Sequence, residues 1–474
     1  MAETVNTLVR LPEYMREANR SLFEPRVVSI GPYHRAKKST HMDEAHKEGH
    51  RANKSTHDME AHKERLVQAF FDRQGNENRE FYVEEITAHC FAQALHWYGG
   101  DVGGYTANML MLDGCFIVEL LLLQWEDKAR ADNYIRIMWN SIYYDLLLVD
   151  NQIPFFVVER IFRRFRSRNE NPAFDNTQLL HLVTRFFNPI NREGQFSWAP
   201  AKLAPDVLPA AAANQVRHLL DVQHRLAVWN TGTEPTATLN CSRCVDICGR
   251  GRASTMPRGI PAANELQDYG VRFLVDDATP SEKSKIFDGK IRGDGDLVDK
   301  SEQRKIFDVK FEGNGAMTIP RFEINFGSKI LLANLFAYEQ IVRQPCDKHG
   351  AVTSYIALMN ALINTADDVM VLQRAGILDN LLSSEKEVAS FFNGLGRCTM
   401  LDMREHRYSG MFQDVNKYWM SHLNFSKYLA IFRLKHLRNP WTCISLLGAI
   451  LLVIFSFTSM IIAILNFVKY KRLL

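Results

Sequence analysis

The sequence predicts a mainly α protein: a helical body with a small β-hairpin element and one C-terminal transmembrane helix. Three observations lead to this prediction. Apolar residues recur at helical spacing through most of the chain, a short stretch alternates apolar and charged residues before the pair Asn314-Gly315, and residues 441–468 contain no charged side chain. At 474 residues, 46% of them hydrophobic, the chain is long enough to bury a sizeable core.

Residues 1–228 are predicted to form an N-terminal helical half. Five apolar clusters have helical spacing: Val67–Phe71, Phe81–Trp97, Cys115–Trp125, Ile135–Val149 and Phe155–Phe165. Proline removes a backbone donor and clashes with the preceding turn of a helix. Pro154 should therefore separate the last two helices, with residues 150–152 as their connection.

A tandem duplication lies in this half, because residues 35–48 recur as residues 51–64 at an offset of 16 residues. Sixteen steps of a helix rotate the second copy by about 160°, so one continuous helix cannot present both copies to the same core. The second copy leads directly into the apolar residues that begin at Leu66. We therefore expect the first copy to be a solvated insertion.

Residues 229–261 are predicted to be a linker with a Cys cluster, because Thr, Gly, Ser, Pro and Arg dominate them. Residues 262–325 are a predicted small β-containing segment, with strands at 270–275 and 305–322 and a hairpin turn at Asn314-Gly315. Within it, residues 281–295 recur as residues 301–315 at an offset of 20 residues. An even offset preserves the strand face, so the first copy is either an additional edge strand or a mobile excursion.

Residues 326–438 are predicted to form a C-terminal helical half, followed by the transmembrane helix at 441–468. A helix of that length spans about 42 Å, more than the roughly 30 Å hydrocarbon core of a membrane. Trp441 and Tyr470 lie at its two ends, where aromatic residues suit the membrane interface. The segment should therefore cross a membrane once.

The orientation of this helix is not decided by charge, because basic residues flank both ends. Only six residues follow Val468, so the span leaves the ribosome after synthesis has finished, and residues 1–20 lack the apolar run of a signal peptide. We expect a single-pass protein, in the plasma membrane, with its large N-terminal domain in the cytosol. The partners expected are membrane lipid around the helix and an unknown protein.

Nucleic-acid binding and a disulfide framework are not expected. The net charge of +3 is too balanced for a nucleic-acid-binding surface, and the eight cysteines are scattered, several of them inside apolar runs. Cys241, Cys244 and Cys248 have metal-like spacing and could hold zinc or an iron–sulfur cluster, but no well-placed fourth ligand follows. The linker composition favours incidental thiols.

A histidine-rich stretch also invites a metal interpretation: His41, His46, His50, His57 and His62. His46 and His50 are four residues apart and would share a helix face, but the duplication accounts for most of this density. An exposed charged helix is the favoured interpretation. No metal site, cofactor or cofactor-binding residue is predicted.

No nucleophile elbow or nucleotide-binding glycine loop is found in the sequence. Four carboxylates flank apolar helices and could form a buried acid pair: Asp113, Glu119, Asp150 and Glu159. A helix cap, or an ion pair with Arg160, is the favoured alternative. The arginine run from Arg160 to Arg168 is predicted to be a solvated helix face rather than a lipid or partner contact. No catalytic residue is predicted.

An ordered set of motifs carries a family resemblance. They are Leu11-Pro12-Glu13, 27–34 (VVSIGPYH), 59–63 (MEAHK), 111–116 (MLDGCF), 150–156 (DNQIPFF), 262–273 (AANELQDYGVRF), Ile319-Pro320, 338–340 (YEQ), 362–369 (LINTADDV) and 439–442 (NPWT). Together they resemble the plant DUF247 family, also called UPF0481, over nearly the whole chain. The resemblance implies a plant membrane protein with a helical body, one C-terminal span and no assigned activity. The two duplications and the Cys-bearing linker depart from the family pattern.

Two functions follow as hypotheses. Some members of the family are implicated in pollen–stigma self-incompatibility, which favours a membrane-anchored recognition or interaction protein. The alternative is a membrane-anchored enzyme with an unfamiliar site that uses Asp113, Glu119 or Asp150 as acid or base. A deep pocket lined by these carboxylates would favour the enzyme, whereas a filled core at that place would count against it.

Overall fold

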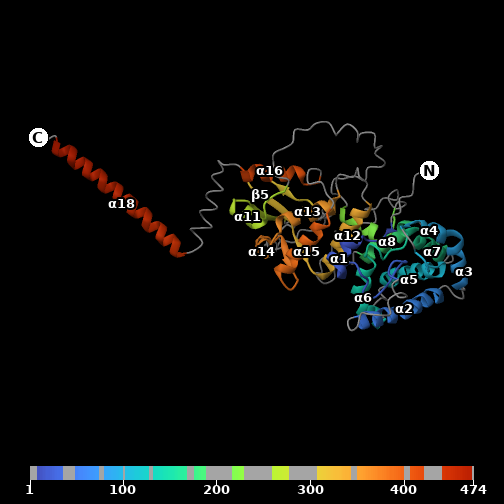
Figure 1. Ribbon diagram of the computed structural model, residues 1–474. Coiled ribbons are helices and arrows are strands. Elements are labelled where there is room, and N and C mark those ends of the chain that lie inside the picture. Colours follow the sequence, from blue (N-terminus) through green and yellow to red (C-terminus); the bar gives the residue numbers. More distant parts are fainter. Residues whose placement is uncertain are drawn as a thin grey trace, which may run out of the picture.

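The computed structural model describes residues 8–35, 49–73, 79–99, 102–126, 132–167, 176–187, 216–228, 259–276, 307–342, 350–399, 406–420 and 440–471. The predicted fold class is confirmed: helices dominate and the strands are short (Figure 1). In the first half of the chain the helices are α1 (Glu13–Ala18), α2 (Gly49–Asp72), α3 (Arg79–Ile86), α4 (Ala92–His96), α5 (Ala107–Trp125), α6 (Asn133–Asp145), α7 (Phe155–Ser167), α8 (Asn176–Phe187) and α10 (Leu219–Val228). A 3₁₀ turn, Arg20–Leu22, follows α1, and a π turn, Thr87–Phe91, joins α3 to α4.

The second half contains α11 (Ala263–Asp268), α12 (Phe326–Val342), α13 (Ala351–Leu362), α14 (Ala366–Arg374), α15 (Glu385–Arg397), α16 (Ser409–Met420) and α18 (Pro440–Lys471). Buried apolar side chains from Leu11 to Val415 form one continuous cluster. The helices of the two halves therefore share a core, and α12 packs against both α6 and α10.

Helix α5 lies at the centre of the N-terminal half, with α2, α7 and α8 packed around it. It begins where the Thr106 hydroxyl accepts a hydrogen bond from the Met109 amide at 3.3 Å, as an N-cap residue does. Gly114 lets α7 approach closely, because a side chain at this position would overlap Ile161. The predicted apolar clusters lie mainly on helices, although residues 146–149 follow the end of α6 and the Phe81–Trp97 cluster is divided among α3, the π turn and α4. Helix α7 begins directly after Pro154 as predicted.

In the described part of the chain, three small sheets accompany the helices. Strands β1 (Leu8–Val9) and β2 (Tyr98–Gly99) pair in parallel, as do β6 (Phe322–Ile324) and β7 (Leu378–Asn380). The third sheet has the order β3 (Arg272–Asp276), β5 (Ala316–Pro320), β4 (Lys310–Phe311). The predicted hairpin is confirmed, because β4 and β5 are antiparallel and Gly315 turns between them with φ +82°. The parallel pairing of β3 with β5 was not predicted.

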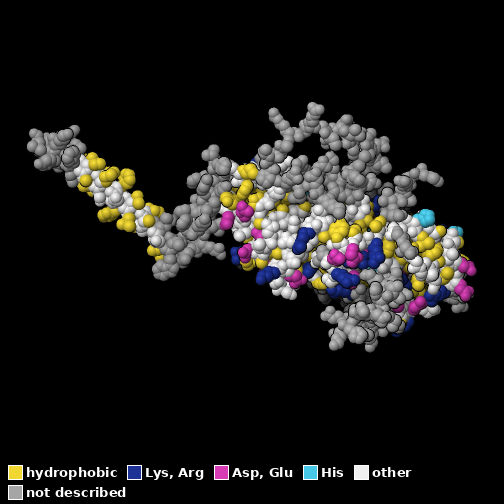
Figure 2. Space-filling model, in the orientation of Figure 1, with side chains coloured by type: hydrophobic (Ala, Val, Ile, Leu, Met, Phe, Trp, Pro, Cys, Tyr) yellow, Lys and Arg dark blue, Asp and Glu magenta, His cyan; other side chains and the backbone are white. Residues whose placement is uncertain are grey.

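Among the described residues, two helices are long and apolar enough to cross a membrane, and the bent pair α13 and α14 would be a third candidate if it formed one broken span. The apolar window of α5 is 67% buried, so α5 is a core helix. The window Leu447–Leu465 of α18 is 0% buried, and apolar side chains cover its surface (Figure 2). The predicted C-terminal helix is therefore present, and it is an exposed candidate membrane anchor.

The duplicated segments are only partly described. The second copy of the first duplication lies within α2, whereas residues 36–48 are outside the described residues. In the second duplication, Phe307 and Val309 are buried, but they precede β4, which begins only at Lys310. Residues 281–295 are outside the described residues. The Cys cluster at 241–248 also lies outside them.

Candidate functional site: a buried polar network around residues 26–35

The 26–35 segment (Arg26–Arg35) runs through the interior with little regular structure of its own. Side chains from other elements therefore satisfy its backbone, since a buried amide without a partner is costly. The Asp145 carboxylate at the end of α6 accepts hydrogen bonds from the amides of Arg26, Val27 and Val28 at 3.0, 2.8 and 2.9 Å. Burial raises the pKa of Asp145 to about 6 although these three hydrogen bonds lower it.

Asp113 on α5 holds the turn of the 26–35 segment. It accepts hydrogen bonds from the Gly31 amide at 2.8 Å, the Tyr105 hydroxyl at 2.8 Å and the Arg35 guanidinium at 2.6 Å, and it pairs with the Lys63 ammonium on α2. The side chains of Asp113 and Lys63 are fully buried. Burial alone would raise the pKa of Asp113, but the charges of Arg35 and Lys63 outweigh that effect and hold the pKa below its usual value.

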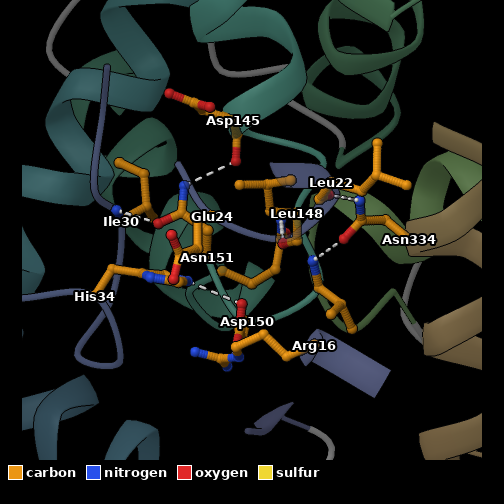
Figure 3. A network of polar contacts seen from close by, with 12 residues as sticks. Arg16, Leu22, Glu24, Ile30, His34, Asp145, Leu148, Asp150, Asn151 and Asn334 are labelled. Atoms are coloured by element: carbon orange, nitrogen blue, oxygen red, sulfur yellow. Dashed lines mark hydrogen bonds and ion pairs between the residues drawn. The ribbon is translucent and has the colours of Figure 1, made fainter. Parts of the chain in front are cut away.

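Asp150, in the connection between α6 and α7, holds the same segment from another side. Its carboxylate pairs with the Arg16 guanidinium of α1 at 2.5 Å and with His34 Nε2 at 2.9 Å (Figure 3). Burial alone would raise the pKa of Asp150, but the hydrogen bond and charge of His34 and the charge of Arg16 lower it below the usual value. The 26–35 segment is thus fixed between two ionised carboxylates.

Amide side chains complete the network (Figure 3). Asn151 accepts a hydrogen bond from the Ile30 amide at 2.7 Å and donates to the Val28 carbonyl at 3.1 Å. From the other half of the chain, Asn334 of α12 accepts from the Val149 amide and donates to the Leu22 carbonyl, both at 2.9 Å. This network therefore joins the N-terminal segment, the α6–α7 connection and α12.

A second buried polar cluster joins α10 to α12 and α13. The Glu339 carboxylate accepts hydrogen bonds from the amides of Val352 and Thr353 at the start of α13, at 3.1 and 2.7 Å, and from His224 Nε2 at 2.8 Å. Burial opposes its ionisation, but the hydrogen bond and charge of His224 and the hydrogen bonds of Thr353 lower the pKa of Glu339. The Tyr338 hydroxyl donates to Asp221 of α10 at 2.8 Å. Glu339 thus caps α13 and holds α10.

The carboxylates singled out from the sequence do not form an acid pair with one another. Asp113 pairs with Lys63 and Arg35, Asp150 pairs with Arg16 and His34, and Glu119 pairs with Arg73 at 2.9 Å. The expected ion pair with Arg160 is wrong, since Arg160 binds Glu85 at 2.6 Å. Burial raises the pKa of Glu159 against the charge of Arg163.

The arginines of α7 are also less solvated than predicted. Arg164 lies over the Phe81 ring, with 4.4 Å between the guanidinium carbon and the ring centroid, and Arg166 donates to Gln178. Arg163 is exposed, and Arg160, Arg164 and Arg166 are partly exposed, so the predicted solvated face is only partly covered by groups of α3 and α8.

The histidine stretch forms no metal centre in the part of the chain that the structure describes, where no cluster of three or more His, Cys, Asp or Glu is found. His50, His57 and His62 lie on α2, and the ring of His62 stacks on Tyr134 with 3.6 Å between the centroids. His41 and His46 lie outside the described residues. His62 is thus a packing residue.

Asp113 has no free acceptor position for proton transfer. A carboxylate offers about four acceptor positions, and Asp113 receives four donors from the protein itself. A general base needs a free acceptor within reach of its substrate. The buried charges instead form ion pairs and hydrogen bonds that hold together segments distant in the sequence.

Comparison with known proteins then places the chain. The family model described as "Plant protein of unknown function", DUF247, matches residues 8–455. The chain belongs to this family. It is 25% identical to the UPF0481 protein At3g47200 of Arabidopsis thaliana, over 98% of this chain and 87% of that protein. It is 20% identical to the putative UPF0481 protein At3g02645 of the same plant, over 96% of this chain and 89% of that protein. No solved structure matches it.

Several of the DUF247 motifs supply residues of the buried polar network or of the second polar cluster. The motif at 27–34 lies in the 26–35 segment, the motif at 111–116 supplies Asp113, the motif at 150–156 supplies Asp150 and Asn151, and YEQ supplies Tyr338 and Glu339. Arg16 and Asn334 were not predicted from the sequence, and Lys63 had no predicted role. The sequence does contain a signal for Lys63, because this lysine is the last residue of the motif MEAHK. A lysine that only faced solvent would not need a fixed position in a motif.

Proposed function

We propose that this protein is a single-pass membrane protein that recognises another protein, with α18 as its anchor in the plasma membrane and its helical body in the cytosol. The observation that carries the proposal is the contrast between the two apolar helices. The apolar window of α5 is two-thirds buried, whereas that of α18 is exposed on every side and needs a lipid environment.

The polar network supports recognition over chemistry. Asp113, Asp150 and Glu339 each use their acceptor atoms to hold backbone segments and buried cations of the same chain. Such a network makes the body rigid, and a rigid body presents a fixed surface to a partner at a low entropic cost. The resemblance to a family with members implicated in pollen–stigma recognition agrees with this function.

The proposal is tested in plant cells with the full chain carrying a biotin ligase at its N-terminus. Protease added to sealed microsomes should remove the ligase, because the body faces the cytosol. Biotinylated proteins should include a reproducible set that is missing when the same ligase is carried by an unrelated tail-anchored protein in the same membrane. A protected N-terminus would overturn the orientation, and identical labelled sets would overturn recognition.

A further inference from the structure

The outer edge of strand β3 has no partner among the described residues. In the sheet order β3-β5-β4, β3 pairs on one side with β5, where the Arg272 amide donates to the Gly315 carbonyl at 2.8 Å. Alternate residues of a strand bond to the same neighbour, so the backbone groups of Phe273 and Val275 point away from β5. Two donors and two acceptors are therefore available along this edge.

The side chains beside this edge form a short charged pattern. Arg272, Leu274 and Asp276 are exposed on one face of β3, and Leu274 retains 45% of its accessible surface. Neither Arg272 nor Asp276 forms an ion pair with any residue that the structure describes. Natural edge strands usually carry a proline, a bulge or an inward charge that prevents pairing, and β3 has a central exposed leucine instead.

We propose that β3 pairs with β3 of a second copy of this chain, antiparallel and about a two-fold axis at Leu274. In this register Phe273 lies opposite Val275 of the second copy, and the two outward-pointing residues of each strand exchange four backbone hydrogen bonds. Leu274 meets Leu274 across the axis. Arg272 lies opposite Asp276 of the second copy, and the two-fold symmetry repeats this pair.

Charge complementarity favours a second copy over an unrelated strand. The sequence Arg-Phe-Leu-Val-Asp is complementary to itself only when it is antiparallel, because a parallel arrangement in register would place Arg272 beside Arg272. Figure 1 shows this sheet, marked by β5, at the end of the body opposite α2 and α3.

The anchor is compatible with this arrangement. Residues 421–439 join α16 to α18, and nineteen residues can span up to about 65 Å, so both anchors can enter one membrane. A single strand pair buries less area than a stable soluble dimer needs, and confinement of both copies to one membrane raises their effective concentration. The inference depends on β3 and does not rest on the recognition function proposed above.

Cysteine crosslinking of the full chain in microsomes tests the pairing. Residues opposite each other at a non-hydrogen-bonded antiparallel position have Cβ atoms about 4.5–5.5 Å apart, close enough for a disulfide after a small adjustment. Leu274→Cys should therefore give a covalent dimer on mild oxidation. Leu381→Cys is the matched control, because Leu381 is 62% exposed and follows β7 rather than belonging to β3. A dimer from Leu381→Cys at equal yield, or none from Leu274→Cys, would overturn the proposal.

Charge exchange tests the register. In the Leu274→Cys background, Arg272→Asp or Asp276→Arg alone places like charges opposite each other twice, and the yield of dimer should fall about fivefold. When the two single variants carry different tags and are expressed together, an aspartate faces an arginine at both pairs of the mixed dimer. The mixed dimer should return to the original yield. A mixed yield as low as that of either variant alone would contradict the register.

Discussion

Replacing Asp113 by asparagine removes the buried carboxylate that pairs with both Lys63 and Arg35. The Lys63 side chain is fully buried, so its ammonium would be left without a counter-charge in the core. The asparagine side chain would also point an NH₂ group toward donors that, in the wild type, are hydrogen-bonded to a carboxylate oxygen. Breaking a buried ion pair by removing one partner costs about 3–5 kcal/mol, against a total stability of about 5–15 kcal/mol for a folded domain.

Urea unfolding of the full-length protein in detergent, followed by tryptophan fluorescence, measures this loss. Glu60→Gln is the matched control, because Glu60 lies 3.8 Å from the same arginine, Arg35, but its side chain is 28% exposed. It should cost less than about 1 kcal/mol. Adding Lys63→Met to Asp113→Asn should recover part of the loss, because no buried charge then remains on α2. An Asp113→Asn variant as stable as Glu60→Gln would refute the claim that the buried ion pairs of Asp113 stabilise the fold.

Three further predictions concern the same network. The pKa of Asp150 is lowered, so its contribution is complete above the usual aspartate value near pH 4 and is lost as the pH falls through the lowered value. The urea midpoint should therefore drop between pH 5 and pH 3, and Asp150→Asn should flatten that part of the profile. Gly31→Ala should cost at least about 2 kcal/mol and Gly104→Ala about 1 kcal/mol. Both have positive φ, but only at Gly31 does an added Cβ lie 2.5 Å from a carbonyl oxygen, so equal losses in thermal unfolding would contradict this contact. Asn334→Leu leaves the buried Val149 amide unpaired and should cost about 2 kcal/mol in the same assay, a loss that an unchanged melting temperature would disprove.

Much of the fold follows from local patterns in the sequence. The apolar periodicity predicts the helices, Pro154 separates α6 from α7, and the Asn314-Gly315 pair predicts the β4–β5 hairpin. The parallel pairing of β3 with β5 could not be predicted in this way, because residues 277–315 lie between the two strands and no short turn specifies their register.

The partners of the buried carboxylates could not be predicted from the sequence for the same reason. Arg16 and Asp150 are 134 residues apart, and Lys63 and Asp113 are 50 residues apart. Helical periodicity shows which residues lie on one face of a helix, but it does not show which helices meet. The nearby Arg160 was therefore the natural expectation, and the actual cations come from α1, α2 and the 26–35 segment.

The central claim, that α18 anchors the protein in a membrane, is tested most directly by alkaline carbonate extraction of plant microsomes. An arginine at the centre of a span costs about 3 kcal/mol, so Leu451→Arg combined with Phe455→Arg should prevent stable insertion. The control is Ile137→Arg combined with Leu381→Arg, two apolar side chains exposed on the body by 70% and 62%. Wild type and the control should stay in the membrane pellet, whereas the α18 variant should be extracted. Extraction of the wild type, or retention of the α18 variant, would contradict the claim.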